Sequence, residues 1–418
     1  MTPDHVNTVI VGGGQAGLAM SAHLSEQGID HLVIERDRIA ERWRTARWDS
    51  LVANGPAWHD RFPMLEFEDC ERDGFPTRDS VVRYFETVAA RINAPMRCGV
   101  EVRRAARLAS GRGFRIETSD GIVTADHVVA ATGPFQTPVI PPVVPDGVVN
   151  QIHSCHYRNP EQLEDGGVLV VGAGSSGSQI ADELLRSGRN VWLSVGPHDR
   201  PPRSYRGKDF VWWLGVLGKW QMKTPPAGRE HVTIAVSGAY GGKTVDFRRF
   251  ADRGMTLLGM TRGFEDGVIN VAGDLAQNVA EGDANHLGLL AEADAYVAAN
   301  GLDLPLEEEA KIIGPDPDCI VNPVRRLDLA AAGITNIIWA TGYRQTFDWL
   351  EADVFDGDGK PLHDRGVAAE QGVYFLGLPW LSMRGSSFIW GVWEDARYLA
   401  SHIAGAALAR DSAIATRT

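Results

Sequence analysis

Two short segments of the chain carry glycines at the same spacing after an apolar run. The apolar runs cover residues 8–11 and 168–171, and residues spaced for a helix follow each one. The first glycine of such a unit permits a tight turn, the second lets a pyrophosphate approach the backbone, and the third lets helix and strand pack closely. The helix N-terminus then faces the phosphates, so each segment predicts a dinucleotide site. The glycines are Gly12, Gly14 and Gly17 in the first segment and Gly172, Gly174 and Gly177 in the second.

The position of an acidic residue distinguishes the two predicted sites. In a dinucleotide fold, an acid about 20 residues beyond the first glycine binds a ribose 2′-hydroxyl. Glu35 stands at that place after the first segment, with Arg36 beside it, whereas Ser194 stands there after the second. The first site therefore favours a nucleotide with a free 2′-hydroxyl, such as FAD. Residues between the glycines complete the predicted sites: Gln15 and Ala16 in the first, Ser175 and Ser176 in the second.

Basic residues follow the position where the second acid is missing. The segment HDRPPRSYRGKD contains Arg200 and Arg203, and Arg206 and Lys208 come next. An acid would repel a 2′-phosphate, whereas an arginine binds one through two hydrogen bonds. The second site is therefore predicted to prefer NADPH to NADH, with Arg200 and Arg203 on the 2′-phosphate. The alternative is an ordinary solvated basic loop.

The surrounding pattern predicts an α/β chain with two Rossmann-like domains. Residues 1–145 form the first part of the FAD domain, with a helix at 79–93 and short strands that end in the buried strand 126–133. A proline cluster at 138–145 marks a crossing into an NADPH domain at 146–330, which includes an irregular stretch at 205–290. Residues 331–418 are expected to return to the first domain, so the NADPH domain is an insertion in the FAD domain.

Bulk properties exclude several classes of partner. The chain has 418 residues and a formal net charge of −13, so neither nucleic acid nor an anionic membrane is an expected partner. No run of 18 apolar residues predicts stable membrane insertion, and the early first strand leaves no room for a signal peptide. Four scattered cysteines, without a C-x-x-C pair or a zinc pattern, favour a reducing cytoplasm.

With both glycine segments and two A-T-G turns, the chain resembles the flavin-dependent monooxygenases of the two-dinucleotide type. These include the flavin-containing monooxygenases, the Baeyer–Villiger enzymes and the YUCCA enzymes. The resemblance implies FAD in the first domain and NADPH in the second. It adds Trp43 and Val102 to the FAD site and Asn54, in LVANGPAWHDRFP, as the active-site asparagine. The A-T-G turns that support the cofactors are Ala131, Thr132 and Gly133, and Ala340, Thr341 and Gly342.

One family signature is only half present. His153 and Tyr157 match the second half of the linker motif between the domains, whereas Gly147 and Val149 replace its Phe and Gly. His153 is either part of that motif or a packed linker histidine. The departure bears on the subfamily and leaves the expected fold unchanged.

The resemblance also implies a reaction. NADPH reduces the flavin, and the reduced flavin binds O₂ as a C4a-(hydro)peroxide that oxygenates a small organic substrate. N- or S-oxygenation, Baeyer–Villiger insertion and oxidative decarboxylation share this frame. The open alternatives are an NAD(P)H-dependent reductase or oxidase and a redox-sensing flavoprotein. Asn54 is either a hydrogen-bond donor at the flavin or part of an Asx turn. Six tryptophans near the expected loops are either pocket or core residues: Trp48, Trp58, Trp212, Trp213, Trp390 and Trp393.

Overall fold

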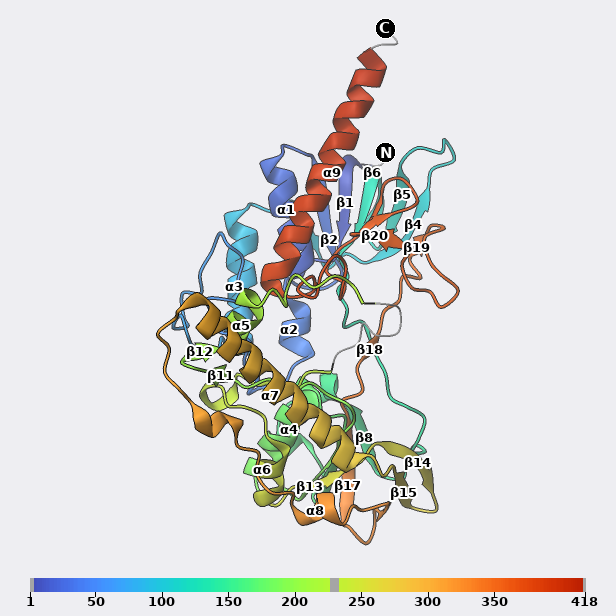
Figure 1. Ribbon diagram of the computed structural model, residues 1–418. Coiled ribbons are helices and arrows are strands. Elements are labelled where there is room, and N and C mark those ends of the chain that lie inside the picture. Colours follow the sequence, from blue (N-terminus) through green and yellow to red (C-terminus); the bar gives the residue numbers. More distant parts are fainter. Residues whose placement is uncertain (1–3, 226–232, 416–418) are drawn as a thin grey trace.

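A computed structural model describes residues 4–225 and 233–415, with side chains from residue 5 to residue 405 in those ranges. Two sheet-centred units lie end to end, and the chain enters and leaves the second unit through neighbouring segments (Figure 1). Those segments, β7 (Thr137–Pro138) and β18 (Tyr343–Arg344), pair antiparallel. The second unit is therefore inserted in the first, as the sequence predicts.

The first unit is built on a ten-stranded sheet whose centre is parallel. The strand β6 pairs in parallel with β1 and β22, and β2 and β3 extend the sheet beyond β1. Central strands read as apolar runs because helices cover them, as in other doubly wound sheets. The strands are β1 (Asp4–Val11), β2 (His31–Glu35), β3 (Met96–Cys98), β4 (Val102–Arg107), β5 (Phe114–Thr118), β6 (Gly121–Ala130), β19 (Leu350–Glu351), β20 (His363–Asp364), β21 (Val367–Ala368) and β22 (Val373–Phe375).

Four helices belong to the first unit. The helix α9 (Ile389–Ala415) runs along α1 (Gln15–Glu26), and α2 (Glu41–Thr45) lies between the two units (Figure 1). Helix α3 (Arg78–Arg91) confirms the helix predicted at 79–93, and its N-cap Thr77 accepts a hydrogen bond from the Ser80 amide. The buried strand predicted at 126–133 is the end of a longer strand, β6, which begins at Gly121, ends at Ala130 and joins the parallel and antiparallel parts of the sheet.

The second unit contains a five-stranded parallel sheet in the order β13-β10-β9-β17-β8. Its strands are β8 (Asn150–His153), β9 (Gly167–Val171), β10 (Val191–Ser194), β13 (Thr256–Leu258) and β17 (Ile334–Trp339). Because β17 lies between β9 and β8, residues 334–339 belong to this sheet. The predicted boundary at 330/331 therefore falls inside the second unit, and the chain returns only at β18.

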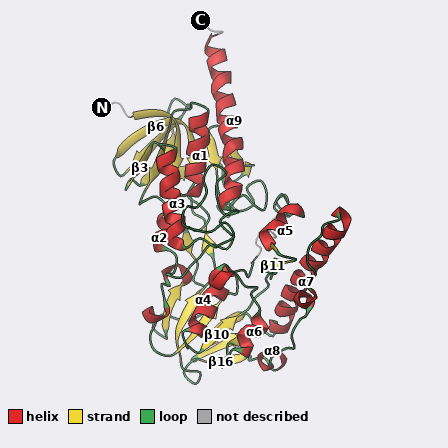
Figure 2. Ribbon diagram, turned by 90° about the vertical axis from the view of Figure 1, so that its left-hand side faces the viewer, coloured by secondary structure: helices red, strands yellow, loops and turns green. Residues whose placement is uncertain are grey.

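The stretch 205–290, expected to be irregular, contains several short elements. It includes the hairpin β11 (Ser204–Tyr205) and β12 (Lys208–Asp209), α5 (Phe210–Val216), α6 (Phe247–Asp252), β14 (Thr261–Glu265) and β15 (Val268–Val271), and residues 226–232 lie outside the described ranges. The remaining elements of the unit are α4 (Ser175–Arg186), α7 (Leu275–Asn300), α8 (Asp318–Val321) and β16 (Arg326–Asp328). Helices α5 and α7 lie together on one side of the unit (Figure 2).

Candidate active site

The first glycine turn joins β1 to α1 and is open at one glycine only. Gly12 has φ +112°, and a Cβ there would lie 2.5 Å from the carbonyl oxygen of Ala131. A Cβ on Gly17 would lie 1.9 Å from the carbonyl oxygen of Gly12, so helix and strand touch as predicted. Around Gly14, by contrast, no atom lies within 4 Å of a Cβ. The turn thus offers backbone to a ligand at Gly14, where a pyrophosphate would approach.

The N-terminus of α1 has no side-chain cap. Gly14 occupies its N-cap position, whereas Asp209 and Asp246 cap α5 and α6 with their side chains. Uncapped amides at a helix start carry partial positive charge and bind anions. The neighbouring residue Gln15 donates from Nε2 to the carbonyl of Ser387 at 2.8 Å, and Ala16 is buried. The start of α1 is therefore linked to the segment that precedes α9.

Glu35 lies against the first turn. Its Oε2 accepts from the Gly13 amide at 2.6 Å and its Oε1 from the Asp37 amide at 2.9 Å. A carboxylate held there is where a ribose hydroxyl would bind. Arg36 is exposed and pairs with Asp37 at 3.2 Å. The other predicted FAD contacts, Trp43 on α2 and Val102 on β4, are half-buried against the core of the first unit.

The second turn repeats this construction between β9 and α4. A Cβ on Gly172 would lie 2.5 Å from the Ala340 carbonyl oxygen, and one on Gly177 would lie 1.8 Å from the Gly172 carbonyl oxygen. One difference appears at Gly174, where the Thr233 methyl lies 3.1 Å from a Cβ position. Ser175 donates from Oγ to the Ile234 carbonyl at 2.7 Å. A nucleotide at this turn would therefore share its approach with the chain at 233–234, and Ser176 is half-buried.

The two A-T-G turns sit behind the glycine turns and face the crossing. Thr132 accepts from Gln136 at 2.9 Å, and Thr341 donates to the Val139 carbonyl at 2.5 Å. Gly133 and Gly342 have positive φ values of 74° and 83°. His153 is fully buried, with Nε2 3.0 Å from the Gly342 carbonyl oxygen, and desolvation lowers its pKa to about 4. His153 is therefore a neutral, packed residue of the crossing.

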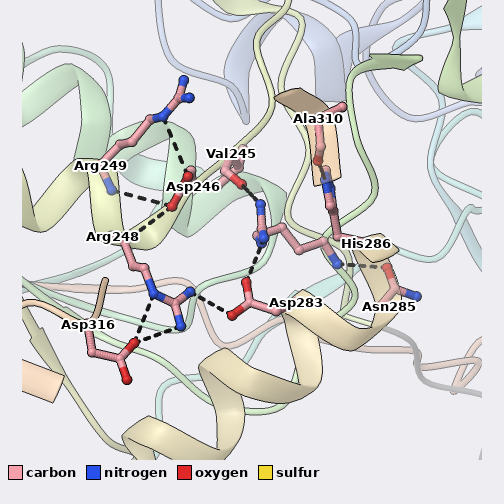
Figure 3. Close-up of polar contacts among 10 residues, drawn as sticks. Val245, Asp246, Arg248, Arg249, Asp283, Asn285, His286, Ala310 and Asp316 are labelled. Atoms are coloured by element: carbon pink, nitrogen blue, oxygen red, sulfur yellow. Dashed lines mark hydrogen bonds and ion pairs between the residues drawn. The ribbon is translucent and has the colours of Figure 1, made fainter. Parts of the chain in front are cut away.

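Arg200 is held inside the second unit. Its guanidinium donates to Asp283 at 2.6 Å and to the Val245 carbonyl at 3.3 Å, and the residue is 4% exposed. Arg248 donates to the other oxygen of Asp283 at 2.6 Å and pairs with Asp316 at 2.7 Å (Figure 3). This buried network joins α7 to the segments around residues 200 and 248. In this conformation Arg200 does not face the second turn.

Arg203 and Ser194 also have internal partners. The guanidinium of Arg203 binds both carboxylate oxygens of Asp209 at 2.5 Å and lies between the rings of Phe75 and Phe210. Desolvation lowers its pKa, and Asp209 opposes that shift. Ser194 donates to the Gly259 carbonyl at 2.9 Å. In this arrangement these residues bind other parts of the chain. Their contact with a 2′-phosphate stays a prediction.

Two other arginines, Arg42 and Arg47, lack a carboxylate partner among the described residues, and sequence reasoning missed them. Arg42 on α2 has two buried donor atoms, Nε and Nη2, without a hydrogen-bond partner, and its guanidinium lies 5.8 Å from the Tyr343 ring centre. Arg47 lies 5.0 Å from the Phe135 ring centre, and desolvation lowers its pKa. Within the described ranges, neither forms an ion pair with a carboxylate. Two such cations at the crossing fit a cofactor phosphate, and the dense basic stretch RWRTAR was the available signal.

Asn54, on the segment between α2 and α3 of the first unit, contacts the second unit. Its Oδ1 accepts from Gln179 on α4 at 2.8 Å, and its carbonyl accepts from Arg203 at 2.6 Å. Its Nδ2 amide group makes no hydrogen bond to the part of the chain that the structure describes. The segment around Asn54 is thereby fixed to α4, the helix that follows the second turn.

The start of α9 is stabilised by a buried serine–aspartate network. Ser386 is fully buried and its Oγ accepts from the Ser382 and Met383 amides at 3.0 and 3.1 Å. Ser382 donates to Asp395, whose pKa burial raises. The helix begins at Ile389, three residues after Ser386. Of the six tryptophans noted above, Trp48, Trp213 and Trp393 are core residues, whereas Trp58 and Trp390 come together around His59.

The chain is similar in sequence to known oxidoreductases. Residues 9–213 match the family model described as pyridine nucleotide-disulphide oxidoreductase. A Geobacillus kaustophilus oxidoreductase described as CzcO-like is 32% identical over 403 residues, which cover 95% of this chain and 98% of that protein. The probable indole-3-pyruvate monooxygenase YUCCA4 of Arabidopsis thaliana is 30% identical over 388 residues, covering 91% and 87%.

Solved structures share the fold at low identity. A flavin-containing monooxygenase from Stenotrophomonas maltophilia has a TM-score of 0.65 at 19% identity, over 97% of this chain and 99% of that one. The bacillithiol disulfide reductase Bdr from Bacillus cereus has a TM-score of 0.61 at 17% identity, over 96% and 99%. Both have the two-unit architecture of this chain, so the fold alone does not separate oxygenation from disulfide reduction.

Fold and turns define an oxidoreductase with two dinucleotide-binding units, for which FAD and NADPH are the fitting cofactors. The 30% identity to a YUCCA enzyme extends over 91% of this chain. The chain therefore belongs to the flavin-dependent monooxygenase family. No helix within residues 4–225 and 233–415 is long and apolar enough to cross a membrane. The same described residues hold no cluster of three or more His, Cys, Asp or Glu side chains that could bind a metal.

Proposed function

We propose that this chain is an FAD-dependent monooxygenase that oxidises NADPH. One atom of O₂ enters a small organic substrate, and the other leaves as water with the electrons of NADPH. The observation that carries the proposal is the position of Asn54, which is fixed to the NADPH-side helix through Gln179 at 2.8 Å with its own amide donors free. A hydrogen-bond donor held in place between two cofactor sites can bind a substrate or reacting group that lies between the cofactors.

The bound cofactors supply the redox chemistry, since flavin reduced by NADPH reacts with O₂. The protein binds and orients them. The uncapped start of α1 and Glu35 would hold the flavin nucleotide, and the second turn would hold NADPH. Arg42 and Arg47 would bind a phosphate of NADPH at the crossing. Gln15 links the first turn to the segment before α9, so the dipole of that helix would add to the electrostatic field at the flavin site.

The cysteines argue against a disulfide reductase. A reactive thiol needs a lowered pKa and, in most reductases, a nearby second cysteine. Burial raises the pKa of all four thiols, and their sequence positions form no C-x-x-C pair. Cys155, the most buried, lies at the crossing. An oxidase that only forms H₂O₂, or a redox sensor, is the second candidate.

Rapid mixing tests the proposal. The purified protein is reduced with NADPH without oxygen and mixed with O₂, and flavin spectra are followed with and without added amines, sulfides and ketones. A transient species that differs from oxidised and reduced flavin, followed by an oxygenated product in proportion to NADPH, is expected. Direct return to oxidised flavin with one H₂O₂ per NADPH, with every substrate class, would replace the monooxygenase by an oxidase.

Substitution of Asn54 tests its part in this reaction. We expect Asn54→Ala to keep NADPH oxidation but to divert it to H₂O₂, lowering the yield of oxygenated product about a hundred- to thousandfold, since removing one positioned donor costs about that much. Asn300→Ala, at the C-terminal end of α7, is the matched control and should leave the yield unchanged. Equal yields in both variants would show that Asn54 only shapes its turn.

A further inference from the structure

Two buried polar atoms without partners lie in one aromatic cluster next to the Asn54 segment. The His59 ring centre is 5.5 Å from those of Trp58, Trp220 and Trp390, and Phe388 lies 5.0 Å from Trp220. His59 Nε2 and Trp390 Nε1 are both buried and make no hydrogen bond to any described residue. A buried polar atom without a partner is destabilising, so two in one cluster call for a function.

Asp60 fixes the orientation of this histidine. Its Oδ1 lies 2.7 Å from His59 Nδ1, and its Oδ2 accepts from the Gly55 amide at 2.9 Å. A carboxylate only accepts hydrogen bonds, so Nδ1 carries the proton. In the neutral ring, Nε2 is then an acceptor. The side chain is 9% exposed, so this acceptor is directed into the aromatic cluster rather than into solvent.

The cluster therefore offers one acceptor and one donor within aromatic walls. Trp390 Nε1 is a donor only, and Trp390 lies in the first turn of α9. Ser387, two residues before that helix, accepts a hydrogen bond from Gln15 of the first glycine turn. Charged side chains on the surrounding elements are paired with each other or hydrogen-bonded: Arg61–Glu66, Arg203–Asp209, Lys219–Glu292, Arg384–Asp199 and Asp395–Ser382. Each cation of that set already has a carboxylate partner.

We propose that His59 and Trp390 are the substrate-binding pair of this enzyme, for an uncharged planar aromatic molecule that bears an N–H or O–H group. The N–H or O–H donates to His59 Nε2, the Trp390 N–H donates to the same group or to an adjacent acceptor, and the indole rings pack on the ring of the ligand. That the bound molecule is a substrate rests on the proposed function, whereas its binding can be measured without turnover.

Binding to the oxidised FAD-loaded protein tests this pair. Indole and benzofuran have the same bicyclic shape, but only indole carries an N–H, and each is titrated by calorimetry and by tryptophan fluorescence. We expect indole to bind at least about tenfold more tightly, because benzofuran leaves the buried acceptor unpaired. His59→Phe should abolish that difference. Trp390→Phe, which keeps a ring, should weaken both ligands, and Trp349→Phe should change neither.

The choice between a neutral and an anionic ligand separates this arrangement from an anion site. Indole should bind more tightly than indole-3-acetate, and preference for indole-3-acetate over indole would overturn the proposal in favour of a carboxylate site. Equal affinity for indole and benzofuran would overturn the proposal and would indicate that His59 Nε2 and Trp390 Nε1 bind water instead of a ligand. Any of these results leaves the rapid-mixing test of oxygenation unaffected.

Discussion

Gly14→Ala separates the binding of flavin from the folding of the first turn. No atom lies within 4 Å of a Cβ at Gly14, and the residue has φ −84°, which alanine adopts without strain. The substitution changes an N-cap glycine to alanine, which costs about 0.5–1 kcal/mol of stability. The apoprotein is therefore expected to fold with an almost unchanged free energy of unfolding.

Flavin binding should respond far more strongly. The added methyl group would stand where the pyrophosphate approaches the uncapped amides of α1. Each charge-assisted hydrogen bond lost there is worth about 1.5–3 kcal/mol, so the loss of two costs about 3–6 kcal/mol. At 1.4 kcal/mol per factor of ten, the Kd for FAD rises about 10²- to 10⁴-fold. The variant should purify colourless, and flavin fluorescence titration of the apoprotein measures the change.

Two further glycine variants make the result interpretable. Gly288→Ala lies on α7 with no atom within 4 Å of its Cβ position, so it should keep FAD and gain about 0.5–1 kcal/mol of stability. Gly17→Ala places a Cβ 1.9 Å from the Gly12 carbonyl oxygen and should destabilise the apoprotein itself. If Gly14→Ala binds FAD with the wild-type Kd, the pyrophosphate does not approach the backbone at this turn and the assignment of the first site is refuted.

Three other perturbations probe the crossing and the second unit. Asp283→Asn leaves Arg200 and Arg248 buried without their shared carboxylate, so urea unfolding should show a loss of about 3–5 kcal/mol while the NADPH Kd of the folded protein is kept; a large change in that Kd alone would contradict a structural role. His153 titrates near 4 when folded and near 6.5 when unfolded, so the unfolded chain binds more protons between these values; stability should fall by about 3 kcal/mol as pH drops from about 6.5 to about 4, and His153→Gln should remove that part of the slope. Arg42→Gln should weaken NADPH about tenfold in equilibrium titrations: an equal loss for NADH assigns the arginine to the pyrophosphate, a loss for NADPH alone assigns it to the 2′-phosphate, and no loss for either removes it from the site.

Local signals predicted both glycine turns between strand and helix. Each turn is specified within about 25 residues, because the apolar strand, the glycines and the residue at the acid position all belong to a single βαβ unit. The A-T-G turns were found for the same reason, and the structure adds why they matter: Ala131 and Ala340 are the residues that Gly12 and Gly172 touch. The alternating pattern also predicted the α/β class and the insertion.

Partners that are distant in sequence could not be predicted. The charges after Ser194 suggested a phosphate site, but the carboxylate that binds Arg200 comes from α7, 83 residues further on. Nothing near residue 200 shows that a long helix will return there. In the same way, β17 joins the second sheet through pairing with β8 and β9, so the domain boundary depends on contacts across more than 160 residues.

The segment around Asn54 likewise depends on distant contacts. Its residues have no periodicity, because successive side chains serve different neighbours: Asn54 binds α4, Asp60 orients His59, and His59 meets rings from α9 and from Trp220. A repeat cannot specify this arrangement, since each contact is unique. The glycine turns can therefore be alike in both units, whereas we propose that the segment around Asn54 carries the chemistry particular to this chain. Substitutions in that segment should accordingly alter coupling and ligand choice before they alter FAD or NADPH affinity.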